Sequence, residues 1–592
     1  MHDLVIRGGT IVDGTGAPRF VGDIAIDGDR IVAVGTVAGR GHREIDAKGL
    51  LVTPGWVDMH THYDGQVTWD PYFTPSGWHG CTTVVMGNCG VGFAPCRAPE
   101  REWLVNVMEG VEDIPGAALT EGIRWDWETF PEYLDAIERI PHAIDFGTQV
   151  PHAALRAWVM GVRQSETDTA TPEQIAEMSA LVEEAIDAGA LGFSTSRTSL
   201  HKSAEGILVS GTFADPAELY GIAEGIRRAG HGVFELAPDH LMVPTDLPMM
   251  RKLAEITGQP VVFNLSQTDF SPETWRKGLE GLEKAAADGL PLYAQCAGRA
   301  IGVQMSWRLT AHPFVAFPSM EAIASLPWSE QLEQLRDPAF RQRLLTETPR
   351  ELNVFERFVT ESFDKMYPLV DALYEPDPSQ SIAAIAKREG RSPLEVAYDQ
   401  MLTADGEGML YFPLFNYSDK SYDLLHELHQ HERTRMGLSD GGAHCGAVCD
   451  GGMPTYMLTF WTRDRVRGPL LPLEHVVKRQ TSETARFYGM HDRGVLKPGF
   501  KADVNVIDYE RLSLSAPTIA HDLPAGGRRL VQKASGYVAT VCSGVVIAEH
   551  DEVNGAMPGK LVRGPQEAPI DARSRRELAP GQGFLRADHP GA

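Results

Sequence analysis

The stretch that decides the fold reads Leu50-Leu51-Val52-Thr53-Pro54-Gly55-Trp56-Val57-Asp58-Met59-His60-Thr61-His62. Its apolar run predicts a buried strand, and two histidines one residue apart at the end of that strand share one face. Converging imidazoles suit a divalent metal such as zinc. A His-x-His pair also arises by chance, but its place after Pro-Gly-Trp-Val-Asp-Met favours metal binding by His60 and His62 over a structural role.

Beyond this stretch, apolar strands alternate with helical patterns, which is typical of a parallel α/β architecture. The candidate strands end near His62, Gly87, Gln149, Thr195, Glu235, Asn264, Gln295 and Asp440. Eight parallel strands are the number that a TIM-type barrel needs. We therefore predict an α/β fold with a (β/α)8 barrel over residues 53–494.

The two ends of the chain are β-rich. Short β-branched runs separated by Gly and Asp turns occupy residues 1–52 and about 495–550, and they predict a small β-sandwich built from both chain ends. Residues 303–430 are too many for an ordinary loop, so we predict a lid-like insertion over the barrel mouth. Residues 551–592, rich in Pro, Gly and charge, are expected to form a C-terminal tail.

Bulk composition narrows the class of protein. A chain of 592 residues is too long for one simple core. Its net charge of −26 argues against nucleic acid or an anionic membrane as a partner. No signal peptide or membrane-spanning run is visible, and the seven cysteines are scattered. These features predict a cytoplasmic enzyme with reduced thiols that acts on a small molecule; association into a homo-oligomer is left open.

Three further positions carry candidate chemistry. Cys89, in Gly87-Asn88-Cys89-Gly90, follows an apolar run and can approach a metal as thiolate; a buried free cysteine is the alternative. Asp440, in Ser439-Asp440-Gly441, ends the last predicted strand, where a carboxylate can bind metal and exchange protons; a turn aspartate is the alternative. His152 could polarise a substrate carbonyl, or merely cap a loop.

Together these motifs resemble the amidohydrolase superfamily, in particular its N-acyl-D-amino-acid deacylase (D-aminoacylase) branch. The resemblance extends to the opening stretch over residues 4–14, to residues 189–195 and to residues 494–503. It implies a TIM-type barrel with a β-sandwich, zinc, and hydrolysis of an amide-type bond. It also implies that His60, His62, Cys89 and Asp440 form the metal site, with Asp440 as general acid and base.

Two departures from the family pattern concern the metal. The family has a histidine at the end of the fifth strand, where this chain has Glu235, a residue that could itself ligate a metal. The family has Ser-His near the end of the sixth strand, where this chain reads Asn264-Leu265-Ser266-Gln267. Amide side chains are poor zinc ligands. We therefore expect one zinc ion rather than two.

Other departures concern the substrate. The family lysine after the sixth strand is absent, and the arginine after the catalytic aspartate is replaced within His444-Cys445-Gly446-Ala447. Such cations hold the free carboxylate of an N-acyl amino acid. Their loss argues against a simple N-acyl-D-amino acid as substrate. Polar groups that could contact the substrate instead are Arg197, His201, Lys202, Glu235 and Arg299; solvation at the surface is the alternative for each.

Three hypotheses follow. The first is zinc-dependent hydrolysis of an amide C–N bond, with metal-activated water, Asp440 as general acid and base, and His152 beside the oxyanion. The second is a hydrolase that acts on a cyclic amide or another acyl derivative. The third is a catalytically inert barrel kept as a binding or assembly subunit; the presence of His60, His62 and Asp440 argues against it.

Overall fold

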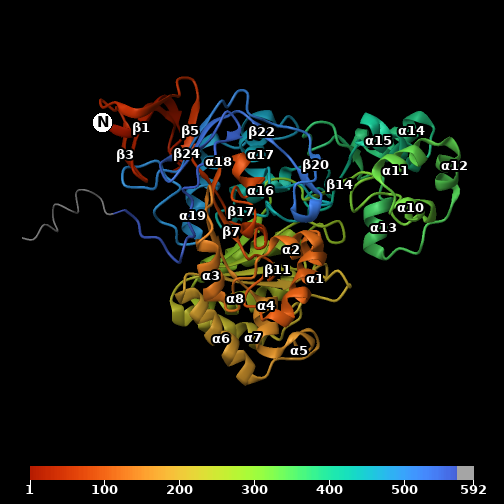
Figure 1. Ribbon diagram of the computed structural model, residues 1–592, viewed down its shortest axis with the longest axis horizontal. Coiled ribbons are helices and arrows are strands. Elements are labelled where there is room, and N and C mark those ends of the chain that lie inside the picture. The colour runs from red at the N-terminus through yellow and green to blue at the C-terminus, as the bar shows by residue number, and fades with distance from the viewer. Residues whose placement is uncertain (570–592) are drawn as a thin grey trace, which may run out of the picture.

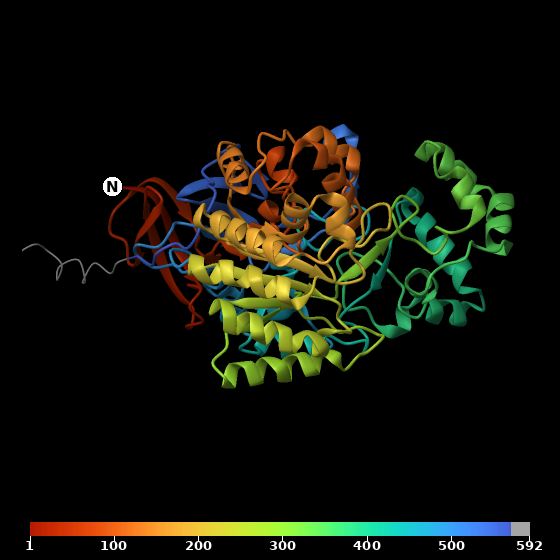
Figure 2. The same cartoon turned by 90° about the horizontal axis from the view of Figure 1, so that it is seen from below.

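Parallel strands form the centre of the computed structural model, which describes residues 1–569 (Figures 1 and 2). One array has the order β6-β7-β8 and the other β9-β10-β11-β12-β13-β17. Only Gln149 separates β8 from β9, so we count these two strands as one segment. Eight strand segments then follow one another in chain order. They are β6 (Trp56–Asp58), β7 (Cys81–Met86), β8 (Asp145–Thr148) with β9 (Val150–Pro151), β10 (Gly192–Arg197), β11 (Val233–Pro238), β12 (Val261–Asn264), β13 (Leu292–Cys296) and β17 (Thr434–Met436). The predicted α/β class is confirmed.

The two arrays do not join into one closed ladder within residues 1–569. Between β17 and β6 there is an isolated parallel bridge from Thr61 to Gly441, and the His62 N–H donates to the Gly441 carbonyl at 2.8 Å. Strand β17 ends at Met436, four residues before the predicted Asp440. Left-handed backbone at Leu438 (φ 59°) and Asp440 (φ 49°) ends the extended conformation there.

Helices cover the outer face of the strands, and in Figure 1 several of them stack below the strands. Those that follow successive strands are α4 (His152–Met160), α6 (Pro172–Asp187), α7 (Pro216–Ala229), α8 (Val243–Thr257), α9 (Thr274–Ala287) and α16 (Asp423–Gln430). Thr171 caps α6, and its hydroxyl accepts from the Gln174 N–H. None of the helices in residues 1–569 combines the length and hydropathy needed to cross a bilayer.

Strands from the two chain ends pair in a nine-stranded sheet at one end of the molecule (Figure 1). Its strands are β1 (His2–Ile11), β2 (Phe20–Asp27), β3 (Arg30–Gly35), β4 (Gly41–Asp46), β5 (Leu51–Pro54), β18 (Val504–Ile507), β23 (Tyr537–Cys542), β24 (Val545–Glu549) and β25 (Glu552–Val553). The two ends meet where β5 runs antiparallel to β18. The two chain ends thus form one β domain. Its strands are joined in one ladder through β5 and β18, and residues of β1, β2, β18 and β23 share a single core.

The long insertion forms a lobe with its own core, and it projects from the end opposite the nine-stranded sheet (Figures 1 and 2). It contains β14 (Gly302–Met305), α10 (Pro318–Ile323), α11 (Trp328–Arg336), α12 (Pro338–Thr346), α13 (Val354–Glu361), β15 (Tyr367–Pro368), α14 (Ile382–Glu389), α15 (Pro393–Gly406) and β16 (Leu410–Pro413). Helix α16 packs on β13 and β17 instead. The lobe thus ends before α16, and the predicted limit at residue 430 extends too far.

A buried ion cluster ties these parts together. Asp145, at the start of β8, lies 2.6 Å from Arg493 Nη1, contacts the Lys501 ammonium, and accepts from the Lys560 N–H at 2.9 Å. Residues 559–562 thereby run alongside β8. They belong to the predicted tail, whose residues 570–592 lie outside the described residues.

Replacing Asp145 by asparagine should destabilise the protein by about 3–5 kcal/mol, because two buried cations lose their carboxylate. Thermal unfolding followed by circular dichroism measures the effect. Asp135→Asn is the matched control, since Asp135 pairs with Arg563 at the exposed surface and such pairs contribute at most about 1 kcal/mol. Equal midpoints for the two variants would contradict the proposed importance of the buried cluster.

Candidate metal centre

Four side chains converge at the carboxyl ends of β6, β7 and β17. His60, His62 and Cys89 are buried, and their ligand atoms all lie within 4.8 Å of one another. Cys89 Sγ is 3.4 Å from His60 Nε2. Asp440 Oδ1 is 3.4 Å from His60 Nε2 and 3.8 Å from His62 Nε2. Tetrahedral coordination with bonds of about 2.0–2.3 Å requires donor separations of this size. His60, His62 and Cys89 are therefore close enough to share one metal ion, and the Asp440 carboxylate lies against both imidazoles.

Unusual backbone conformations place two of these donors. Cys89 (φ 56°) and Asp440 (φ 49°) both adopt left-handed backbone conformations, which residues other than glycine rarely adopt. Gly90 is required beside Cys89, because a Cβ there would lie 2.6 Å from the Ser196 backbone nitrogen. The Asp440 N–H donates to the His60 carbonyl at 3.2 Å. Strained backbone held by its surroundings is characteristic of functional sites.

A second layer of polar groups orients the donors. Gln295 Oε1 lies 3.1 Å from His60 Nδ1, so a proton on Nδ1 leaves Nε2 free for a metal. Glu235 Oε2 accepts from the Cys89 N–H at 3.0 Å. Burial lowers the pKa of His60 to about 3, which keeps the imidazole neutral as a ligand must be. Burial, together with the nearby Glu235 carboxylate, raises the pKa of the Cys89 thiol, so a thiolate there requires a bound cation.

The analysis of the sequence missed Glu112, the last residue of α1 (Arg101–Glu112). Its carboxylate is buried, with Oε1 3.2 Å from His62 Nδ1 and Oε2 3.5 Å from His444 Nε2. A signal was present in the sequence. Leu104, Met108 and Glu112 are spaced by four, so a carboxylate lies in the buried stripe of an amphipathic helix.

His152 does not join this cluster, which corrects its predicted catalytic role. Its ring nitrogens lie 2.8 Å from Thr195 Oγ1 and 2.9 Å from Glu218 Oε1. Thr195 is adjacent in β10 to Ser194, whose hydroxyl contacts the backbone of Gly87 and Gly90. Neighbouring side chains in a strand face opposite sides, so Thr195 faces away from these glycines. His152 therefore lies between the strands and α7, with both nitrogens already engaged.

The remaining candidates divide into two groups. Glu235 and His201 lie near the proposed metal donors. Glu235 accepts a hydrogen bond from the Cys89 N–H. Burial is the main cause of the lowered pKa of His62, and His201 is one of the neighbouring imidazoles that lower it further. Arg197 instead pairs with Asp246, Arg299 is buried against Asp450 at 2.8 Å, and Lys202 is exposed. The predicted cationic surface is thus occupied by internal partners or turned to solvent.

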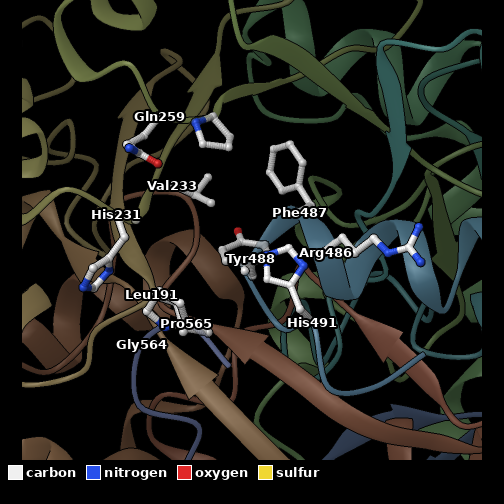
Figure 3. A pocket seen from close by; sticks show the side chains of 13 residues that line it. Leu191, His231, Val233, Gln259, Arg486, Phe487, Tyr488, His491, Gly564 and Pro565 are labelled. Atoms are coloured by element: carbon white, nitrogen blue, oxygen red, sulfur yellow. The ribbon is translucent and has the colours of Figure 1, made fainter. Parts of the chain in front are cut away.

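A separate cavity of about 260 Å³ lies at the amino-terminal ends of β10 and β11 (Figure 3). Its lining includes Leu191, His231, Val233, Tyr488 and Pro565. None of the four metal donors lines it. Asp440 instead opens onto a small cavity that it shares with Asp450 and Arg529. The chemistry therefore belongs at the carboxyl ends of the strands, as in barrel enzymes generally.

A model of the amidohydrolase family matches residues 43–548, which is most of the chain. The chain belongs to the amidohydrolase family. Two relatives from Alcaligenes xylosoxydans xylosoxydans align over nearly their whole length. N-acyl-D-aspartate deacylase is 26% identical over 585 residues, covering 96% of each chain. N-acyl-D-glutamate deacylase is 28% identical over 540 residues, covering 88% of this chain and 90% of the relative.

Solved structures share the fold of this amidohydrolase. A crystal structure of D-aminoacylase superposes with a TM-score of 0.63 at 23% identity, covering 95% of this chain and 100% of the other. N-acyl-D-glutamate deacylase from Bordetella bronchiseptica, complexed with zinc and a phosphonate inhibitor, gives 0.60 at 22% identity, with the same coverage. The protein is a metal-dependent hydrolase of carbon–nitrogen bonds other than peptide bonds. The hypothesis of an inert subunit is therefore abandoned.

Proposed function

We propose that this amidohydrolase uses one zinc ion to hydrolyse the C–N bond of an amide, with Asp440 as general acid and base. The observation that carries the proposal is the convergence of His60, His62 and Cys89, with the Asp440 carboxylate 3.4 Å from His60 Nε2 and 3.8 Å from His62 Nε2. We further propose that the two arrays of strands form the wall of one TIM-type barrel, since the Thr61–Gly441 bridge lies between β17 and β6.

Each side chain has a role in this reaction. Zinc, when bound, would polarise the amide carbonyl and acidify a water molecule. Asp440 accepts a proton from the attacking water and returns it to the departing nitrogen. Burial and the nearby carboxylates raise the pKa of Asp440 well above its usual range, a shift that favours a carboxyl able to hold that proton. Gln295 and Glu235 keep His60 and Cys89 in place.

Charge around the site favours a substrate without a carboxylate. Glu112, Glu235 and Asp440 lie within the donor cluster or against it. Two candidate cations already have carboxylate partners: Arg299 pairs with Asp450, and Arg529 with Asp522 at 2.8 Å. A substrate carboxylate would lie beside like charges, with neither arginine free to receive it. We therefore propose an N-acyl amine, or a cyclic amide, that is uncharged next to the scissile bond.

The substrate proposal predicts a preference between matched amides. N-acetylisopentylamine, the decarboxylated counterpart of N-acetylleucine, should be hydrolysed with a kcat/KM about 10- to 100-fold higher than either enantiomer of N-acetylleucine. The range corresponds to about 1–3 kcal/mol for a charged group left without a partner. Release of the amine is followed with an amine-reactive fluorophore. Dihydrouracil serves as the cyclic amide, and its hydrolysis is followed by loss of ultraviolet absorbance because ring opening releases no amine.

Two outcomes would count against different parts of the proposal. Faster hydrolysis of an N-acetylleucine enantiomer would contradict the uncharged substrate while leaving amide hydrolysis in place. Zinc-loaded protein that hydrolyses no member of a wider panel of N-acyl amines, N-acyl amino acids and cyclic amides would contradict the proposed reaction.

A further inference from the structure

A single carboxylate connects the metal donors with the loop that carries the catalytic aspartate. Glu112 Oε1 lies 3.2 Å from His62 Nδ1, and its Oε2 lies 3.5 Å from His444 Nε2. The Glu112 side chain is 1% exposed, and neither its Oε2 nor His62 Nδ1 has a hydrogen-bond partner among the described residues. A buried carboxylate is unfavourable unless it is paired. The two histidines are the groups placed to pair with it.

The main chain reinforces this connection. The His444 N–H donates to the backbone carbonyl of Glu112. The next residue, Asp113, accepts from the Gly446 N–H at 3.0 Å and from the Thr310 hydroxyl at 3.1 Å. Thr310 belongs to the inserted lobe, so the end of α1 holds the 440–449 loop and the lobe in place. His444 is left-handed (φ 52°) and its side chain is 27% exposed.

We propose that Glu112 is a positioning residue that fixes both histidines at once. By accepting a hydrogen bond from His62 Nδ1–H, Glu112 would keep the proton on Nδ1 and leave Nε2 for the metal. By accepting one from His444 Nε2–H, it would leave His444 Nδ1 as an acceptor facing the substrate, four residues from Asp440. Glu112 thereby couples metal binding to the placement of a substrate-contacting imidazole. The inference rests on the zinc site proposed above.

Zinc affinity tests the first half of the inference. Glu112→Gln should bind zinc about 10- to 100-fold more weakly than the wild type in a chelator competition assay, since losses of this size follow removal of a metal ligand's partner. Its cobalt-substituted form should show a shifted d–d absorption spectrum. Asp113→Asn is the matched control, because it contacts the same loop without touching either histidine, and its zinc affinity should be unchanged.

The second half is tested at His444. His444→Gln should keep the wild-type zinc affinity but lose about 10-fold or more in kcat/KM, as expected for a group that contacts substrate. Glu112→Asp, whose shorter side chain reaches only one histidine, covers the case in which Glu112→Gln does not fold.

Each result separates the inference from the proposed function. Wild-type protein that binds no zinc contradicts the metal centre itself. Wild-type protein that binds zinc, with Glu112→Gln and Glu112→Asp matching it in affinity and cobalt spectrum, overturns the positioning role alone. Unchanged kcat/KM in His444→Gln would contradict the proposed contact between His444 and the substrate.

Discussion

Asp440→Asn should lower kcat by about 10²- to 10⁴-fold, the range in which a positioned general acid and base contributes. Asparagine retains the size of the side chain and one oxygen that can face the metal, but it cannot accept the proton of the attacking water. Asp440 Oδ1 is the atom that lies 3.4 Å from His60 Nε2 and 3.8 Å from His62 Nε2. Steady-state hydrolysis of the best amide from the substrate panel provides the measurement.

The controls for Asp440→Asn are its thermal stability, its zinc binding and a variant at an exposed aspartate. The variant should keep its thermal midpoint and bind zinc, since His60, His62 and Cys89 remain. Asp464→Asn, at an exposed ion pair with Arg463, should behave as wild type in every assay. Turnover within about threefold of wild type in Asp440→Asn, against the loss expected from removing a general base, would remove Asp440 from the proton transfers.

The proposed metal donors were within reach of the sequence because each lies two to four residues after the end of a strand. His60, His62, Cys89 and Asp440 follow β6, β7 and β17, and parallel strands bring their carboxyl ends to one side of a fold. The positions of Glu112 and Gln295 beside the two histidines were beyond such reasoning. Glu112 reaches the site through the path of α1, and no local pattern specifies where a helix will pack.

Errors in the sequence analysis have the same origin. His152 follows a strand as closely as Cys89 does, but it packs on the outer side, where Glu218 of α7 receives it. Strand position alone does not fix the direction of a side chain once the strand has ended. Arg299 looked like a free cation, yet it is buried over the ring of Tyr374 and paired with Asp450. Such long-range pairing depends on tertiary contacts between residues far apart in the chain, here 151 residues.

Loss of the metal should follow from replacing both imidazoles. The double variant His60→Ala, His62→Ala should fall from about one bound zinc per chain to a small fraction, because a single Cys89 thiol and one carboxylate cannot complete a tetrahedral site. Activity should be lost and should not return when zinc is added. The measurement is metal content by mass spectrometry after dialysis, with turnover assayed on the same samples.

His152→Gln is the control for the loss of zinc in the double variant. His152 is a buried histidine of the same fold, bonded to Thr195 and Glu218 on the outer face of the strands. Its replacement should lower the thermal midpoint, since Glu218 loses a buried partner, while about one zinc per chain is retained. Zinc loss in His152→Gln equal to that in the double variant would mean that the metal responds to general destabilisation. Retention of zinc in the double variant would instead show that the ion is held by other residues, and would remove the His60–His62 pair from the metal centre.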